Sequence, residues 1–122
     1  MAHIEFNALK SYIDTICRFG DRRDFINDFA GVAFEEADHF MMVQDALEKE
    51  GYSYGSFPLH TIIRDRCMLS SESVLDRLAV VSLCQEGRGM DTGHALASKV
   101  RLMNPNQGDI VSRIADDEER HV

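Results

Sequence analysis

Two Glu-x-x-His pairs stand far apart in the sequence, Glu36 with His39 and Glu118 with His121. Residues three apart share one face of a helix, so each pair would present a carboxylate oxygen and an imidazole nitrogen to the same point. Such mixed oxygen and nitrogen donors can bind a metal ion. A lone pair of this kind is also common on solvated helix faces, so the metal hypothesis needs support from elsewhere in the chain.

Two further glutamates, Glu5 and Glu86, supply that support because they also fall on apolar stripes. Glu5 precedes Leu9 by four residues, and Glu86 follows Leu83 by three and Ala79 by seven. These spacings are typical of side chains that share a buried helix face. The sequence therefore predicts four inward carboxylates and two inward histidines.

The Glu-x-x-His pairs follow apolar residues at helical spacing: Phe29 and Val32 before Glu36, and Val111 and Ile114 before Glu118. Burying four carboxylates in one core is prohibitively costly without positive charge. Two metal ions would supply that charge, and carboxylate-rich ligation favours iron, with manganese as the other candidate. In the competing interpretation the acids pair with arginines, for which the candidates are Arg18, Arg77 and Arg88.

The elements that must carry these residues are all predicted to be helices, because no stretch alternates as a strand would. The first expected helices cover residues 2–19 and 23–50, and a short helix follows at 59–68. A third long helix, capped by Ser70 or Ser71, is expected to run to about residue 90, and residues 91–103 form either a shorter helix or the bent end of the third. The last expected helix is capped by Asp109. The inward residues expected on the first and third long helices are Leu9, Tyr12, Ile13, Ile16, Cys17, Leu75, Leu78, Ala79 and Leu83.

This order predicts a fold as well as a site. Along the chain the ligand candidates run Glu, Glu-x-x-His, Glu, Glu-x-x-His on successive long helices. Ferritin-like two-metal proteins place one Glu on each of two helices and Glu-x-x-His on each of the other two. We therefore expect an all-α, ferritin-like antiparallel four-helix bundle with a short extra helix between the second and third long helices. Its two metal ions would be held by Glu5, Glu36, His39, Glu86, Glu118 and His121.

At these same residues the chain resembles an uncharacterised family (a domain of unknown function) of the ferritin-like di-iron superfamily. The matching pieces are AHIE (2–5), RF (18–19), EEADHF (35–40), YGSFPLH (54–60), DRLAVV (76–81), QEGRGMD (85–91), GD (108–109) and DEERHV (117–122). The resemblance implies a bundle that holds two metal ions. Members of the family extend beyond both ends of this chain, so 1–122 is expected to be one bundle domain cut from a longer protein.

The net charge of the chain limits the kinds of partner that it is expected to bind. The net charge of -8 argues against nonspecific nucleic-acid binding, although similar proteins of the superfamily include a tRNA-modifying hydroxylase. A tRNA would need a local basic patch, for which Arg64, Arg66 and Arg77 are the candidates.

The chain has neither an apolar run long enough for a membrane helix nor the pattern of a signal peptide, so we expect a cytoplasmic protein without a membrane partner. The three cysteines contain no CxxC pair and are expected to be reduced.

Three more residues are candidates for supporting roles around the metals. His60 follows a proline in the loop and could cover the site, while Arg88 and Asp91 lie shortly after Glu86 and could orient its neighbours. Each also has a plain structural explanation, as a surface histidine or a salt bridge.

The expected function is an O2-activating di-iron oxidase or monooxygenase. Its substrate would be a small organic molecule or a nucleoside, and an oxygenase would also need an electron donor. The alternative is a metal-handling bundle, a ferroxidase or storage protein without an organic substrate. Neither the substrate nor the oligomeric state follows from the sequence.

Overall fold

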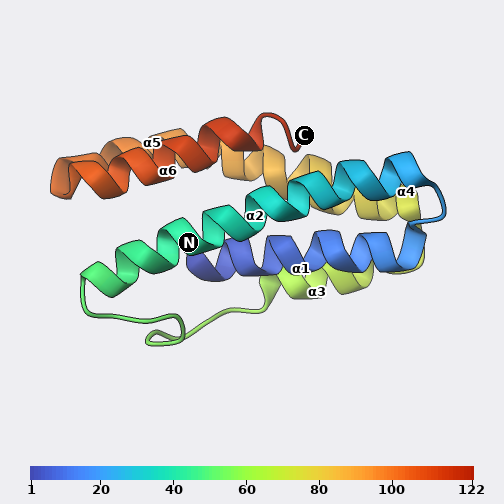
Figure 1. Ribbon diagram of the computed structural model, residues 1–122, viewed down its shortest axis with the longest axis horizontal. Coiled ribbons are helices and arrows are strands. Elements are labelled where there is room, and N and C mark those ends of the chain that lie inside the picture. The colour runs from blue at the N-terminus through green and yellow to red at the C-terminus, as the bar shows by residue number, and fades with distance from the viewer. The chain divides into compact units, whose positions relative to one another are not determined.

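The computed structural model describes all residues from 1 to 122 and contains helices but no strands. The all-α prediction is therefore confirmed. In chain order the elements are α1 (Ala2–Phe19), α2 (Arg23–Lys49), α3 (Ile62–Leu69), α4 (Val74–Arg77), the π-helix η1 (Leu78–Glu86), α5 (Gly87–Met103) and α6 (Pro105–Glu118) (Figure 1). The short α3 lies in the connection after α2, as the sequence predicts.

The chain divides into two compact units, Met1–Leu78 and Ala79–Val122. Each unit is described by itself below. The expectation of a single bundle domain over 1–122 stays a prediction. None of the helices has the length and apolarity that a membrane crossing requires.

The first unit is built on an antiparallel hairpin of α1 and α2, joined by a tight turn at residues 20–22 (Figure 1). The ring of Tyr12, which is 1% exposed, packs 5.7 Å from that of Phe29 between centroids, and Phe25 stacks on Phe29 at 4.4 Å. Helix α2 ends at a Schellman motif, in which Gly51 has a φ of 83° and the Tyr52 N–H donates to the Leu47 carbonyl at 3.0 Å.

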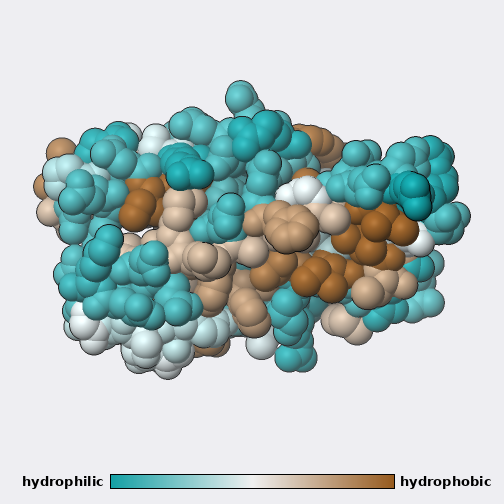
Figure 2. All heavy atoms as spheres, in the orientation of Figure 1, coloured by the Kyte–Doolittle hydropathy of each residue, from teal (hydrophilic) through white to brown (hydrophobic).

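The buried face of α1 differs from the predicted apolar stripe. Ile13 is 48% exposed, whereas Ser11 and Thr15 are buried. Their hydroxyls are satisfied inside the helix: Ser11 Oγ donates to the Asn7 carbonyl at 2.8 Å, and Thr15 Oγ1 donates to the Ser11 carbonyl at 2.7 Å. Because this local bonding removes the cost of burying a hydroxyl, small polar residues can face inward in place of Ile13 and Cys17. Figure 2 shows hydrophobic atoms left on the surface along α1 and the start of α2.

Arg77 ties three helices of the first unit together and has no exposed surface. Its guanidinium donates to Asp14 Oδ2 at 2.8 Å, Thr15 Oγ1 at 3.0 Å and Ser70 Oγ at 3.1 Å. It also donates to the carbonyl of Cys67 at 3.0 Å. A buried Arg77 cannot join a basic surface patch, so that expectation is wrong for this residue.

Two predicted helix caps are wrong. The hydroxyl of Ser73, not of Ser70 or Ser71, accepts from the N–H of Asp76 at 3.3 Å and caps α4. Ser70 is unavailable for this because its hydroxyl donates to α3 carbonyls, at 3.0 Å to that of Cys67.

Asn104, not Asp109, caps α6, since its Oδ1 accepts from the Gln107 N–H at 3.2 Å and Pro105 follows at the first helical position. The side chain of Asp109 instead pairs with Arg101 at 2.8 Å.

The π-helix η1 explains why the predicted stripe of the third long helix fails at Leu83. Leu83 is 56% exposed, whereas Val81 and Glu86, five residues apart in the same π-helix, are buried. Leu75, which lies before the π-helix in α4, is also exposed, at 74%. A π-helix bonds residue i to i+5, so its faces do not repeat at the α-helical spacing of three and four. The prediction that Glu86 faces inward holds, but the Leu83 and Ala79 spacing used to make it does not.

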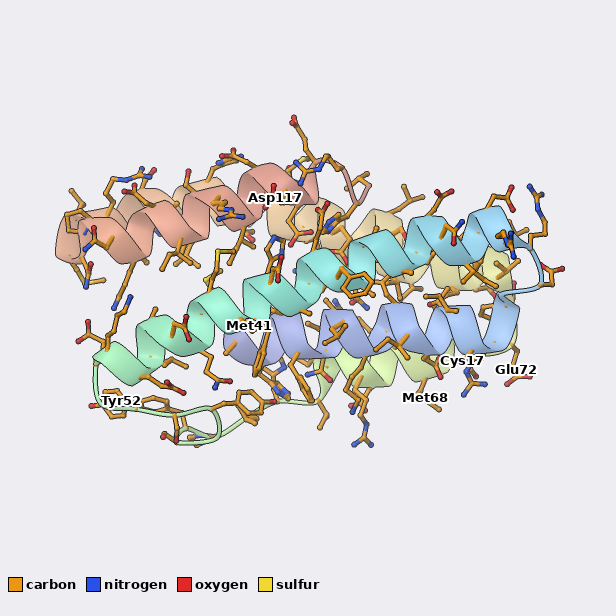
Figure 3. The ribbon with its side chains drawn as sticks, viewed as in Figure 1. Cys17, Met41, Tyr52, Met68, Glu72 and Asp117 are labelled. Carbon is orange, nitrogen blue, oxygen red and sulfur yellow. The ribbon has the colours of Figure 1, made fainter.

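The second unit is an antiparallel hairpin of α5 and α6 (Figure 1). Ala97 of α5 and Val111, Ile114 and Ala115 of α6 are buried. The helices approach closely at Gly93, where an added Cβ would lie 2.6 Å from the Cβ of Ala115. The predicted α6 face with Val111 and Ile114 inward is confirmed. All three cysteines are free; Cys67 is buried, while Cys17 (labelled in Figure 3) and Cys84 are exposed.

Candidate functional site

Glu5, Glu36 and His39, here called the first triad, come together inside the first unit. Each offers one ligand atom, and these atoms lie within 4.8 Å of one another. Helix α1 supplies Glu5 from its first turn, and the middle of α2 supplies the other two. None is more than 3% exposed. His39 Nδ1 lies 3.7 Å from Glu36 Oε2, too far for a hydrogen bond but close enough for one ion to be shared.

Glu86, Glu118 and His121, the second triad, come together inside the second unit by the same criterion. Their ligand atoms also lie within 4.8 Å of one another, and each residue is 5% exposed. Glu86 is the last residue of η1 and Glu118 the last of α6. Each unit thus unites a lone glutamate with a Glu-x-x-His pair.

His121 lies in a turn after α6, which corrects the expectation that it continues the helix. The His121 N–H donates to the Glu118 carbonyl at 3.1 Å, which keeps the turn wound. In the side chains, Nδ1 of His121 lies 3.0 Å from Oε2 of Glu118. Gly89 has no side chain beside that carboxyl; an added Cβ there would lie 3.6 Å from Glu118 Cγ.

The donor set of each triad fits a hard to intermediate metal ion. Two carboxylates and one imidazole favour iron or manganese over metals that prefer thiolate ligands. Two buried carboxylates with oxygens within 4.8 Å repel each other when both are ionised, and a cation relieves that repulsion. Among the arginines proposed as competing partners, Arg18 and Arg77 both bond to Asp14 instead. Arg88 is exposed.

The pKa of Asp14 reflects its pairing with Arg77 and Arg18. Burial alone would raise the pKa of Asp14, but the hydrogen bonds and charges of Arg77 and Arg18 outweigh it and hold the pKa below its ordinary value. The first unit therefore uses its buried arginine for a structural ion pair.

The three residues expected in supporting roles are exposed. His60 lies in the loop before α3, and its backbone carbonyl bonds to the ring of His3 at 2.7 Å. The side chains of Arg88 and Asp91 are exposed on the first turns of α5. Their roles around a metal stay predictions.

Sequence reasoning missed a cluster that the fold builds beside the first triad. His3 Nδ1 lies 2.7 Å from the hydroxyl of Tyr54, 51 residues away along the chain. Burial raises the pKa of Tyr54. The available signal was the occurrence of His3 in AHIE and of Tyr54 in YGSFPLH, pieces recognised by resemblance but given no shared role. No local spacing connects them, since only tertiary packing brings the loop to α1.

The fold and the two triads define an all-α protein with two buried groups of glutamate and histidine. The chain belongs to the family described as "Protein of unknown function (DUF455)", whose model matches residues 1–122. It is 33% identical over 108 residues to an "Uncharacterized protein" of Haemophilus influenzae (strain ATCC 51907 / DSM 11121 / KW20 / Rd). That match covers 82% of this chain and 38% of the relative. No solved structure gives a significant match.

Proposed function

We propose that the two triads are the ligands of two metal ions, most suitably iron, and that the protein is an O2-activating oxidoreductase with a ferritin-like four-helix fold. One observation carries the proposal: within each unit, a lone glutamate and a Glu-x-x-His pair bring buried donors within 4.8 Å of one another. Two lone glutamates and two Glu-x-x-His pairs, each contributed by a different helical segment or its end, are the ligand set of ferritin-like two-metal bundles. The substrate class is a small organic molecule or a nucleoside.

The residues divide the work in a simple way. Four carboxylates offset the charge of the ions, and His39 and His121 add neutral nitrogen donors. The buried positions of all six exclude water, which strengthens each electrostatic contact. When bound, a pair of iron ions supplies the redox chemistry toward O2 that side chains alone lack.

Anaerobic Fe(II) titration of the purified protein, followed by exposure to O2, tests the proposal. We expect an endpoint of two iron ions per chain and an O2-dependent change in the optical spectrum. Glu118→Gln should lower the endpoint, whereas Glu119→Gln, at the neighbouring exposed position, should leave it unchanged. No stoichiometric binding of iron or manganese would overturn the metal centre.

The same experiment separates the oxidoreductase from the metal-handling alternative. An oxygenase without its electron donor stops after the two bound ions are oxidised. A ferroxidase continues to oxidise Fe(II) added in excess, and that outcome would replace the proposed function. Binding of two ions without any reaction with O2 would contradict both.

A further inference from the structure

The loop between α2 and α3 is tied to the first turn of α1 through the ring of His3. Nε2 of His3 lies 2.7 Å from the carbonyl oxygen of His60, and Nδ1 lies 2.7 Å from the hydroxyl of Tyr54. A carbonyl oxygen can only accept, so Nε2 carries the proton, and in the neutral ring Nδ1 accepts from Tyr54. The side-chain amide of Asn7, itself buried, donates to the His3 carbonyl at 2.7 Å. Both nitrogens of the ring are thereby used to hold the loop.

The ring of Tyr54 contacts the immediate neighbours of two ligand candidates. Its centroid lies 5.5 Å from that of Phe6 and 5.3 Å from that of Phe40. Phe6 directly follows Glu5 on α1, and Phe40 directly follows His39 on α2. The two phenylalanines are 5.5 Å apart, so the three rings form one cluster across the helices. A single loop residue therefore bridges the backbone segments that carry Glu5 and His39.

Glu5 is the member of the first triad whose position depends on contacts between helices. Glu36 and His39 lie one turn apart on α2, so that helix itself fixes their spacing. Glu5 lies on α1, so its register with the other two is set by the packing of α1 on α2.

We propose that Tyr54 is a positioning residue for the metal centre. Its hydroxyl holds His3, and its ring holds Phe6 against Phe40, so that Glu5 stays in register with the ligands on α2. This inference rests on the proposed metal-binding function. It assigns the loop a role in ligand geometry, which differs from the direct cover over the site expected of His60.

The variant Tyr54→Phe tests the role because it keeps the ring and removes only the hydroxyl. Loss of one net hydrogen bond should weaken Mn(II) binding by about fivefold. Mn(II) binding is measured by the EPR signal of the free ion. Amide hydrogen exchange in the first two turns of α1 of the metal-free protein should accelerate by about the same factor. Exchange in the middle of α2 should not change.

The matched control is Tyr52→Phe, which removes a hydroxyl from the same loop. Tyr52 is 50% exposed, and its ring lies 5.0 Å from that of Phe57 (Tyr52 is labelled in Figure 3). This variant should behave as the wild-type protein in both measurements.

Unchanged Mn(II) affinity in Tyr54→Phe, or an equal loss in Tyr52→Phe, would overturn the positioning role. If the wild-type protein binds no metal, the proposed function fails. The exchange measurement then still decides the tether: faster exchange around Glu5 supports it, and unchanged exchange overturns it.

Discussion

The first and second triads hold the same three donors on different supports. In the first, two ligands lie in the middle of α2 and the third is braced by the Tyr54 cluster. In the second, Glu86 lies where η1 continues directly into α5, but the Glu-x-x-His pair is at a helix end: Glu118 ends α6, and His121 lies in the turn beyond. A Glu-x-x-His pair can thus be built in the middle of a helix or at its end, and the cost of ordering the histidine should differ between the two.

The ion pair of the first unit is more buried than that of the second, and breaking it should give the largest expected effect. Arg77 is fully buried against Asp14, whereas Arg101 and Asp109 are 44% and 70% exposed. Arg77→Met should lower the free energy of unfolding by about 3 kcal/mol, at the low end for a broken buried pair, since Asp14 still reaches water. Arg101→Met should cost less than about 1 kcal/mol. Urea unfolding followed by circular dichroism measures both, and equal losses would erase the contrast.

Helix packing in the second unit should respond to Gly93→Ala. The new methyl would lie 2.6 Å from the Cβ of Ala115, so the hairpin must shift. We expect a loss of about 1–3 kcal/mol from overpacking.

Gly87→Ala is the control, because an added Cβ there meets nothing within 4 Å. Helix propensity should then raise the free energy of unfolding by up to about 1 kcal/mol. Thermal melts of the two variants should move in opposite directions; a stabilising Gly93→Ala would contradict the close packing of α5 and α6.

The histidines test whether helix-interior ligands are better ordered than those at helix ends. His39→Gln should reduce metal affinity by about tenfold more than His121→Gln, since we expect a histidine in a turn to lose more conformational freedom on binding than one in a helix, at a cost near 1–2 kcal/mol. Mn(II) titration of both variants gives the ratio. A ratio of one would mean that the turn holding His121 is as rigid as the middle of α2.

The smallest expected effect is on the pH dependence of stability, through Asp14 of the first unit. Because the folded-state pKa of Asp14 is lowered, its ion pair stabilises the fold above the unfolded pKa of about 3.9 and is lost as pH falls through the folded value. Asp14→Asn should therefore flatten the loss of stability below about pH 4 in the metal-free protein. Acid titration of the melting temperature checks this, and parallel curves for wild type and variant would refute it.

Local patterns sufficed for much of the fold. The bounds of α1 and α2 follow from apolar spacing and from Gly20 and Gly51, because these signals act within a few residues. The caps at Ser73 and Asn104 could not be chosen from sequence, since several serines and acids compete for each helix start. Ser70 was lost as a cap only because the Cys67 carbonyl and Arg77 engage its hydroxyl.

The six candidate ligands came from the sequence alone, because a Glu-x-x-His pair and inward acids are defined by residue type and helical period. Tertiary structure decided how they are supported. It wound Leu78–Glu86 as a π-helix, which buried Glu86 for a reason that α-helical spacing does not contain. It also brought Tyr54 to His3 across 51 residues, a contact that no local rule predicts because packing alone sets the path of a loop.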